Sequence, residues 1–494
     1  MLQWCGFGWL GSLVWHARRS GQRWTPRRNR FTKSRKETVN MSKSEFEQQS
    51  AFALSRRGAL KRGAQAAGAS VLASVGGVQW AFAADKPALG TWPAGSQGDT
   101  VYIGAAVPLT GTYAVQGADE LKGWELAVEH MNTDHPLMKQ IAPKINKGVL
   151  GKKVALVSAD SAAKPNQAVQ SIQTFINQNK IILATGSTSS AVAVALNKFC
   201  DREKLMYMPG ISGSNDTTGK DCVRYGFRQG YFGEMAANSI GPILVKTFGR
   251  NRKMAFMTPD YTYGHTTTAS TEKYLKEKGG WTTVTNQVSP LGTQDFSQYL
   301  TNIANSGAEF LMNVNWGRDA ILSSQQAKQF GLLPKMTLVL PYQIPFFAKE
   351  AGVDISEGVF AATEFWWELE NKYPMVKEFV DAFRKKYGYA PEWGAENAYV
   401  SFAHWARMVT EAGSFYPPDV IKQWEKGEKM PSLFGDVYYR PEDHQCVRPV
   451  FVVRGKAKKD MKNPEDFWTV VDTQKGEDVI QSPTAFGCKL GSYT

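Results

Sequence analysis

The feature that most constrains the fold is a regular alternation of short apolar strands and amphipathic helices, which begins at Val101. The first strand is expected at 101–107, and a helix follows with apolar residues at helical spacing between Leu121 and Met131. Further strands are expected at 154–158, 181–184 and 205–208, and helices at 168–176 and 191–199. Strand–helix–strand units of this length predict a parallel sheet with helices on both faces.

The alternation starts again after Tyr231, which predicts a second α/β unit of similar size. Its strands are expected at 254–257, 281–288, 310–314 and 336–340, and its helices near 264–278, 296–305 and 319–330. A strand at 359–363, helices at 375–387 and 396–412, and strands at 450–453 and 467–471 complete the pattern. We therefore predict an α/β fold with two lobes, each built on a parallel sheet.

A leader sequence precedes the predicted fold. Arg56 and Arg57 precede a Gly/Ala/Val-rich run that ends in Ala81-Phe82-Ala83. This order indicates a twin-arginine export signal over 41–83, cleaved near Ala83, followed by a linker at 84–99. Met41 begins a conventional polar lead-in, so residues 1–40 are predicted to be an extension that is not translated or is disordered. An Ala-rich helix after a chance arginine pair is the alternative.

The positive charge of the chain lies mainly in this leader. Residues 1–83 hold 14 Lys and Arg residues and 3 acidic residues, whereas the whole chain holds 58 and 45. The remaining 411 residues therefore carry a net charge of +2, which gives no support to nucleic-acid binding. A mature chain of this length can form two domains with separate cores.

Four cysteines follow the leader: Cys200, Cys222, Cys446 and Cys488. An even number in an exported chain predicts two disulfides, and their order favours Cys200–Cys222 and Cys446–Cys488. Four buried free thiols are the alternative. No zinc site is predicted, because the chain has no Cys-x-x-Cys spacing.

Loops that follow the strands are the candidates for ligand contact, because ligands of open α/β sheets lie beyond the carboxyl ends of strands. The loop 108–113 ends in Tyr113, which would wall a pocket. The loop 186–190 contains Ser187, Thr188 and Ser189, whose hydroxyl groups and free backbone N–H groups at a helix start favour a carboxylate. A plain turn and a simple helix N-cap are the respective alternatives.

Two further loops carry polar or aromatic side chains. The loop 209–215 combines Gly210, which permits close backbone approach, with the hydroxyl of Ser212. The loop 259–264 contains Tyr263, which is expected to face the first lobe across a cleft.

The sequence offers no support for catalysis. The loop 186–190 lacks the Gly-Lys-Ser/Thr ending of a nucleotide-binding loop, and Ser214 replaces the second glycine of a serine-hydrolase motif. His130 and His135 lie five residues apart, which does not suit a metal pair on a helix. Fingerprints of haem, iron–sulfur and dinucleotide cofactors are absent from the sequence. We therefore predict a protein that is not an enzyme and needs no metal or cofactor.

Between Thr100 and Val471 the sequence resembles the periplasmic solute-binding proteins of ABC transporters, of the leucine/isoleucine/valine-binding type. The resemblance depends on the order and spacing of several short segments: 103–111, Gly123, a helix ending in Asn132, 186–190, 209–210, 260–264 and 356–358. The Cys200–Cys222 pair also resembles the single disulfide common in that family.

The resemblance implies a type I periplasmic binding protein, in which two Rossmann-like lobes with parallel sheets are joined by three crossovers and close on a ligand by a hinge. The crossovers are expected near residues 228, 360 and 440. The first lobe would then comprise 100–228 and 360–440, and the second lobe 229–359 and 441–494.

The resemblance also implies the ligand contacts. Ser187, Thr188, Ser189, Gly210 and Ser212 would hold the carboxylate and amino group of the ligand from the first lobe. The aromatic side chains that would close over the ligand from the second lobe are Tyr263 and Trp316.

One position departs from the family pattern. The amino-acid binders carry a glutamate after a late second-lobe strand, where it pairs with the ligand's ammonium group, and Tyr342 stands about there in this chain. A buried ammonium without a carboxylate partner is costly. A carboxylate or amide-like ligand therefore becomes an alternative to a branched-chain amino acid, unless Asp260 or Asp319 supplies the missing charge.

The predicted function is that of a soluble periplasmic receptor. It would capture a small polar solute and deliver it to an inner-membrane ABC permease, after export by the twin-arginine translocase. An exported redox enzyme and a ligand sensor of the same fold are the alternatives.

Overall fold

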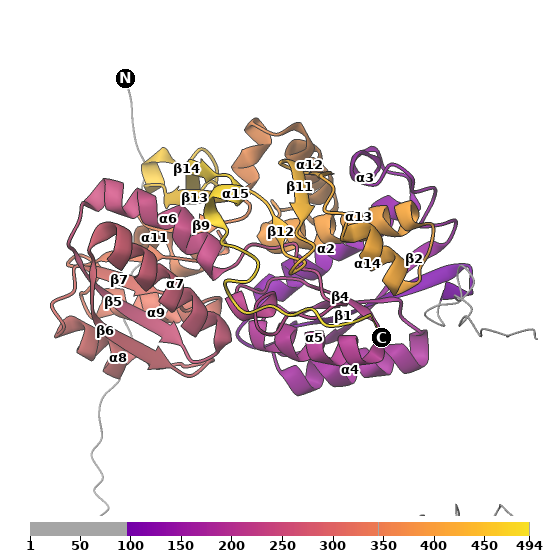
Figure 1. Ribbon diagram of the computed structural model, residues 1–494. Helices are drawn as coiled ribbons and strands as arrows, with labels where there is room; N and C mark the ends of the chain where they lie inside the picture. The colour runs from indigo at the N-terminus through magenta and orange to yellow at the C-terminus, as the bar shows by residue number, and fades with distance from the viewer. Residues whose placement is uncertain (1–95, 344, 494) are drawn as a thin grey trace, which may run out of the picture. The chain divides into compact units, whose positions relative to one another are not determined.

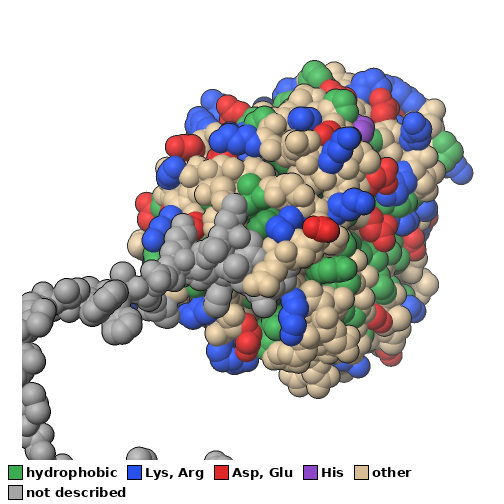
Figure 2. Space-filling model, turned by 90° about the vertical axis from the view of Figure 1, so that its right-hand side faces the viewer, with side chains coloured by type: hydrophobic (Ala, Val, Ile, Leu, Met, Phe, Trp, Pro, Cys, Tyr) green, Lys and Arg blue, Asp and Glu red, His purple; other side chains and the backbone are tan. Residues whose placement is uncertain are grey.

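The computed structural model describes residues 96–343 and 345–493. Arg56, Arg57 and the whole predicted signal segment lie outside the described residues. No helix of the described residues is both long enough and apolar enough to span a membrane. Figure 2 shows one face of the molecule, on which basic and acidic side chains are interspersed.

The first lobe is built on a four-stranded parallel sheet with the order β2-β1-β3-β4. Its strands are β1 (Thr100–Val107), β2 (Lys153–Asp160), β3 (Leu183–Gly186) and β4 (Met206–Pro209). Val107 pairs with Asp160 and Gly186 with Pro209, so the carboxyl ends of neighbouring strands lie at one edge of the sheet. The loops that follow these strands therefore meet there.

Helices cover both faces of this sheet (Figure 1). The helices α4 (Pro165–Asn179) and α5 (Ser190–Glu203) lie together on one face, and α2 (Ala114–Asn132) packs on the other. The long helix α13 (Trp393–Ala412) returns from late in the sequence and packs against α2. The lobe also contains α3 (Pro136–Ile141), α12 (Pro374–Tyr387), α14 (Pro417–Trp424) and a small sheet of β10 (Met430–Ser432), β11 (Gly435–Tyr439) and β12 (Cys446–Val447).

The second lobe is built on a seven-stranded sheet with the order β14-β13-β9-β8-β7-β5-β6. The parallel strands are β5 (Lys253–Pro259), β6 (Thr282–Ser289), β7 (Phe310–Asn313), β8 (Thr337–Leu340) and β9 (Phe360–Thr363). The strands β13 (Val450–Gly455) and β14 (Trp468–Gln474) add an antiparallel edge. Its helices are α6 (Gly233–Phe248), α7 (Thr262–Gly279), α8 (Ser297–Ala304), α9 (Arg318–Gln329), α10 (Phe346–Ala351), α11 (Val353–Ser356) and α15 (Gly476–Val479).

Two segments differ from their expected lobe. The first lobe was expected to resume at residue 360, but β9 pairs with β8 and β13 in the seven-stranded sheet. The expected second-lobe segment 441–494 includes β12, which pairs with β11 in the small first-lobe sheet. The pairing of β9 with β13 joins segments far apart in the sequence, so local patterns do not reveal it. The strands β11 and β12 are close in sequence, and their pairing places the third connection later in the chain than expected.

The connections between the lobes are tied together by hydrogen bonds. The backbone N–H of Arg228 donates to the His444 carbonyl over 3.1 Å, and the N–H of Cys446 donates to the Arg228 carbonyl over 2.9 Å. The backbone N–H of Tyr231 donates to Glu364 Oε2 over 2.8 Å. The three connections, at 228–231, near 364 and at 444–446, therefore lie side by side.

The predicted disulfide pairing is wrong. Cys222 is joined to Cys488, whereas Cys200 and Cys446 are buried free thiols. The C-terminal segment runs back to the first lobe, where Arg224 Nη2 donates to the Gly491 carbonyl over 2.6 Å and the Tyr225 hydroxyl donates to the Tyr493 carbonyl over 2.7 Å. This return brings together two cysteines that are 266 residues apart in sequence. Figure 1 shows the segment passing from β14 and α15 toward β4 and α5.

Peptide mapping of the unreduced protein tests this pairing. We expect a cross-linked peptide pair that joins Cys222 to Cys488, and we expect Cys200 and Cys446 to be alkylated only after denaturation, because both are buried. Replacing Cys488 with Ser should lower the free energy of unfolding by about 2–4 kcal/mol, since the cross-link no longer constrains the unfolded chain. A Cys200–Cys222 peptide pair would contradict the structure.

Candidate functional site

The first-lobe hydroxyl groups that were predicted to contact a ligand differ in whether they already have a hydrogen-bond partner in the protein. Ser187 Oγ shares a hydrogen bond with the Tyr207 hydroxyl over 2.7 Å, and Thr188 Oγ1 donates to Glu120 Oε2 over 2.7 Å. Ser212 Oγ shares a hydrogen bond with Thr217 Oγ1 over 2.8 Å. Only Ser189 among these predicted residues keeps a buried hydroxyl without a hydrogen-bond partner in the described structure.

Ser189 is the N-cap residue of α5, but its side chain makes no cap hydrogen bond. The first backbone N–H groups of a helix have no partner within the helix and carry partial positive charge. The free Ser189 hydroxyl therefore lies beside a set of N–H donors, which is the arrangement that binds a carboxylate.

Glu120 on α2 holds two of these loops together, and the sequence did not reveal this role. Its Oε1 accepts the backbone N–H of Ile211 over 2.7 Å, while its Oε2 accepts the Thr188 hydroxyl. Gly210 is required beside it, because a Cβ at this position would lie 1.4 Å from Glu120 Oε1. Gly210 thus permits the close approach of Glu120.

The predicted aromatic residues come together between the two lobes. Tyr113 and Trp316 have ring centroids 5.0 Å apart, and Tyr263 and Tyr342 have ring centroids 5.3 Å apart. Three further rings complete a cluster that we call the aromatic box: Tyr113, Tyr231, Tyr261, Tyr263, Trp316, Tyr342 and Trp393. The first lobe and the first connection supply Tyr113, Trp393 and Tyr231, and the second lobe supplies the others.

Trp393 is the most important residue that the sequence reasoning missed. Its ring lies 5.0 Å from Tyr342, 5.2 Å from Tyr231 and 6.2 Å from Trp316. It begins α13, whose start is fixed because Asp119 Oδ2 accepts the backbone N–H of Ala395 over 2.9 Å. The only local signal was a tryptophan in the first turn of a predicted helix, and nothing in the sequence linked that turn to the cleft.

The two lobes contact each other directly around the aromatic box. The hydroxyl groups of Tyr113 and Tyr261 share a hydrogen bond over 2.8 Å, and Ser214 Oγ and Thr262 Oγ1 share one over 2.7 Å. A Cβ on Gly213 would lie 2.7 Å from Tyr342 Cζ. The loop 212–214, which also donates the Ser214 N–H to Ser190 Oγ over 3.1 Å, therefore links the start of α5 to the aromatic box.

Several buried polar atoms at this place have no hydrogen-bond partner in the described structure. These atoms are Ser189 Oγ, Asn315 Oδ1 and Nδ2, the indole nitrogens of Trp316 and Trp393, and Asp319 Oδ1. Buried polar groups without a partner are rare in proteins. Other buried polar atoms of the described residues also have no partner, so these atoms support a candidate ligand site only together with the aromatic box.

The two aspartates that could supply a missing charge differ in position. Asp260 is exposed and lies 3.0 Å from His265 Nε2. Asp319 is buried, its Oδ2 accepts the Gly292 N–H over 2.8 Å, and burial raises its pKa to about 6. Only Asp319 is therefore placed to influence a buried ligand.

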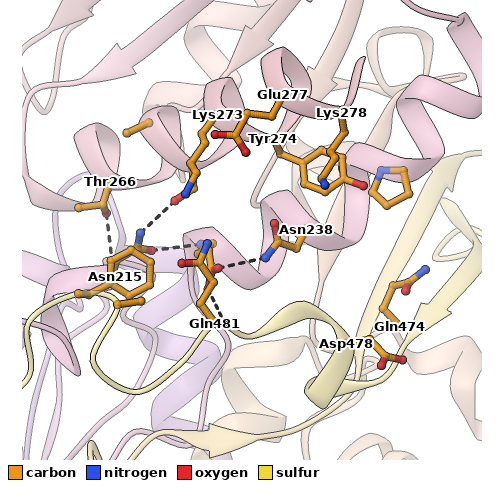
Figure 3. A pocket seen from close by; sticks show the side chains of 16 residues that line it. Asn215, Asn238, Thr266, Lys273, Tyr274, Glu277, Lys278, Gln474, Asp478 and Gln481 are labelled. Carbon is orange, nitrogen blue, oxygen red and sulfur yellow. Dashed lines mark hydrogen bonds between the residues drawn. The ribbon is translucent and has the colours of Figure 1, made fainter. Parts of the chain in front are cut away.

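A separate pocket lies outside the predicted site. Figure 3 shows it between α6, α7 and the C-terminal segment, with Asn215, Thr266, Lys273 and Gln481 among its lining residues and a cavity volume of about 640 Å³. None of the predicted ligand-contact residues lines it. Within the described residues, no group of three or more His, Cys, Asp or Glu side chains is arranged to hold a metal ion.

The fold and the interlobe cluster are those of a two-lobed binding protein, and comparison with known proteins gives the family. The chain belongs to the periplasmic binding protein family, whose model matches residues 100–460. A relative, Leu/Ile/Val-binding protein homolog 8 of Brucella abortus, is 26% identical over 341 residues, which cover 67% of this chain and 81% of that protein.

Solved structures agree with this assignment. A periplasmic binding protein from Burkholderia mallei superposes with a TM-score of 0.71 at 24% identity, over 79% of this chain and 100% of the other. The amino acid ABC transporter substrate-binding protein from Pseudomonas fluorescens Pf-5 gives a TM-score of 0.69 at 25% identity, over 79% and 98%. The expected α/β fold of a type I periplasmic binding protein is thereby confirmed.

The titration of Glu120 provides a test of the first-lobe loops. Burial raises its pKa to about 8, against the opposing effect of the hydrogen bonds from Thr188 and Ile211. Because the folded-state pKa lies above the usual value of 4.5, the stabilisation by its proton is complete below pH 4.5 and is lost as the pH rises toward 8.

Replacing Glu120 with Gln removes this titration. The unfolding free energy of the wild type minus that of Glu120→Gln should therefore fall between pH 5 and pH 8, by at most about 1.4 kcal/mol per pH unit. Urea unfolding at three pH values in this range measures the difference. Parallel stability profiles of the two proteins would contradict the buried state of Glu120.

Proposed function

We propose that this protein is the periplasmic substrate-binding component of an ABC importer and that it binds a small carboxylate-bearing solute between its two lobes. The class of ligand comprises amino acids, such as branched-chain ones, and related carboxylates or amides. The solute is released unchanged to an inner-membrane permease, without an enzymatic step. The family membership and the names of the relatives support this role.

The observation that carries the proposal is the free Ser189 hydroxyl at the start of α5, a helix start that the loop 212–214 links to the aromatic box. The hydroxyl and the adjacent backbone N–H groups would receive the carboxylate, and the rings would enclose the rest of the solute. The predicted contacts Ser187, Thr188 and Ser212 act mainly by holding the loops, because their hydroxyl groups already have protein partners. Tyr113, Tyr263, Trp316 and Tyr342 remain proposed ligand contacts, and Gly210 gives the loop its shape.

Paired serine variants test this assignment. Ser189→Ala should weaken binding of the carboxylate ligand by about 10–100-fold, which corresponds to the loss of one hydrogen bond to a charged group. Ser187→Ala is the matched control and should leave the affinity nearly unchanged, since its hydroxyl bonds to Tyr207. The ligand is found first by thermal shift with a panel of amino acids, carboxylates and amides. A panel without any stabilising compound would contradict the proposed function.

We also propose that the protein reaches the periplasm through the twin-arginine translocase. Replacing Arg56 and Arg57 together with Lys should leave the precursor unprocessed in the cytoplasm, because the arginine pair is the feature that this route reads. Cell fractionation and N-terminal sequencing measure the outcome, with Arg62→Lys as the control. Processing near Ala83 in the double variant would exclude this route.

A further inference from the structure

We propose that the C-terminal segment 475–493, which we call the strap, holds the two lobes together and limits how far they open. This inference concerns the movement of the lobes and does not depend on which ligand they bind. The strap lies beyond residues 100–460, the part of the chain that the family model matches. Figure 1 shows it running from β14 and α15 of the second lobe toward β4 and α5 of the first lobe.

At its second-lobe end the strap is joined to α6. The Asn238 side chain donates to the Val479 carbonyl over 2.8 Å, and the backbone N–H of Gln481 donates to Glu234 Oε2 over 3.3 Å. Glu234 is buried, and its Oε1 accepts a second hydrogen bond from Asn238 over 3.1 Å (Figure 3). The strap also continues directly from β14, the edge strand of the seven-stranded sheet, so this end moves with the second lobe.

The middle of the strap contacts both lobes. The Gln481 carbonyl accepts a hydrogen bond from Arg440 Nη1 over 2.5 Å, and Arg440 directly follows β11 of the first lobe. The Phe486 ring packs edge-on against Phe232, the N-cap residue of α6, with ring centroids 6.0 Å apart. A Cβ on Gly219 of the first lobe would lie 2.6 Å from Phe486 Cβ. Gln481 and Phe486 are therefore each held between the two lobes.

At its first-lobe end the strap is held covalently, because Cys488 is bonded to Cys222. The segment that leads to Cys222 is itself in contact with the second lobe, since Asp216 Oδ2 accepts the hydroxyl of Thr262 on α7 over 2.6 Å. The backbone N–H of Asp221 donates to the Asp216 carbonyl over 3.0 Å and so connects this contact to the cysteine. The disulfide therefore fixes the strap where the lobes meet.

The length of the strap limits the opening. Seven residue steps lead from Gln481 to Cys488, so their Cα atoms can move at most about 24 Å apart. Part of this length is stored in two turns within 482–487, each closed by a backbone hydrogen bond of 3.0 Å. Opening would unfold these turns and expose the apolar surface of Phe486, which costs free energy. The strap thus favours the closed arrangement and sets an upper limit to opening.

Spin labels on the full chain without ligand test the inference. Cysteines introduced at the exposed Gln178 of α4 and Lys276 of α7 place one label on each lobe, while the native free cysteines are buried. Replacing Cys222 and Cys488 together with Ser frees the first-lobe end of the strap. Double electron–electron resonance should then show a broader distribution and a mean label distance that is longer by at least about 3 Å, the length of one extended residue.

A second variant keeps the disulfide. An insertion of about four Gly and Ser residues after the exposed Thr484 lengthens the strap by up to about 14 Å, and it should also increase the mean label distance by at least about 3 Å. The matched control places the same insertion after Gly307, in an exposed turn within the second lobe, and should leave the distance unchanged. Circular dichroism confirms that each variant is folded.

The label distances decide the outcome. An unchanged distance in the Thr484 insertion variant overturns the inference, and so does an equal increase in the Gly307 control. A change in the double serine variant alone also overturns it, because the disulfide would then act on the stability of the first lobe and not through the length of the strap. None of these results bears on the proposed function, since the measurement uses no ligand.

Discussion

Arg228 connects the hinge to the ligand loops, and the geometry of the site depends on it. Its guanidinium is fully buried and donates to the carbonyls of Ser212 and Ser214, while its backbone pairs with residues 444–446 of the third connection. Burial lowers the pKa of Arg228 to about 9. Leaving a buried charge without its partners costs about 3–5 kcal/mol. The loop 209–214 is therefore held to the hinge and follows its position.

Arg448 performs the same task on the other side of the hinge. It lies between Glu364, at the second connection, and Glu396 on α13. Glu364 also accepts the Tyr231 N–H and so fixes one ring of the aromatic box. Hinge and site thus share residues, and a change in the opening of the lobes necessarily changes the spacing of the rings. This coupling is what a receptor requires if closure is to accompany ligand binding.

Sequence patterns predicted the elements and proposed part of the candidate site, for identifiable reasons. The strand and helix alternation is local, so the loops after β1, β3 and β4 could be placed at one sheet edge, and Tyr113 and Tyr263 could be proposed as pocket residues. Trp316 was implied only by the family resemblance. Trp393 could not be proposed, because its place depends on the packing of α13 against α2. Likewise, the sequence could not separate Ser187 from Ser189. The Ser187 hydroxyl bonds to Tyr207 of the neighbouring strand, whereas the Ser189 hydroxyl has no partner in the described structure.

The sequence by itself determined the class of fold, because the periodicity of strands and helices is a local property, and it indicated the family through the order and spacing of short segments. It also proposed the loops that would contact a ligand. Only the tertiary structure decided the Cys222–Cys488 pairing, the membership of β9 in the second sheet and the composition of the aromatic box. Each of these joins residues far apart along the chain. Such contacts depend on burial and on the pairing of polar groups in three dimensions, which no short segment encodes.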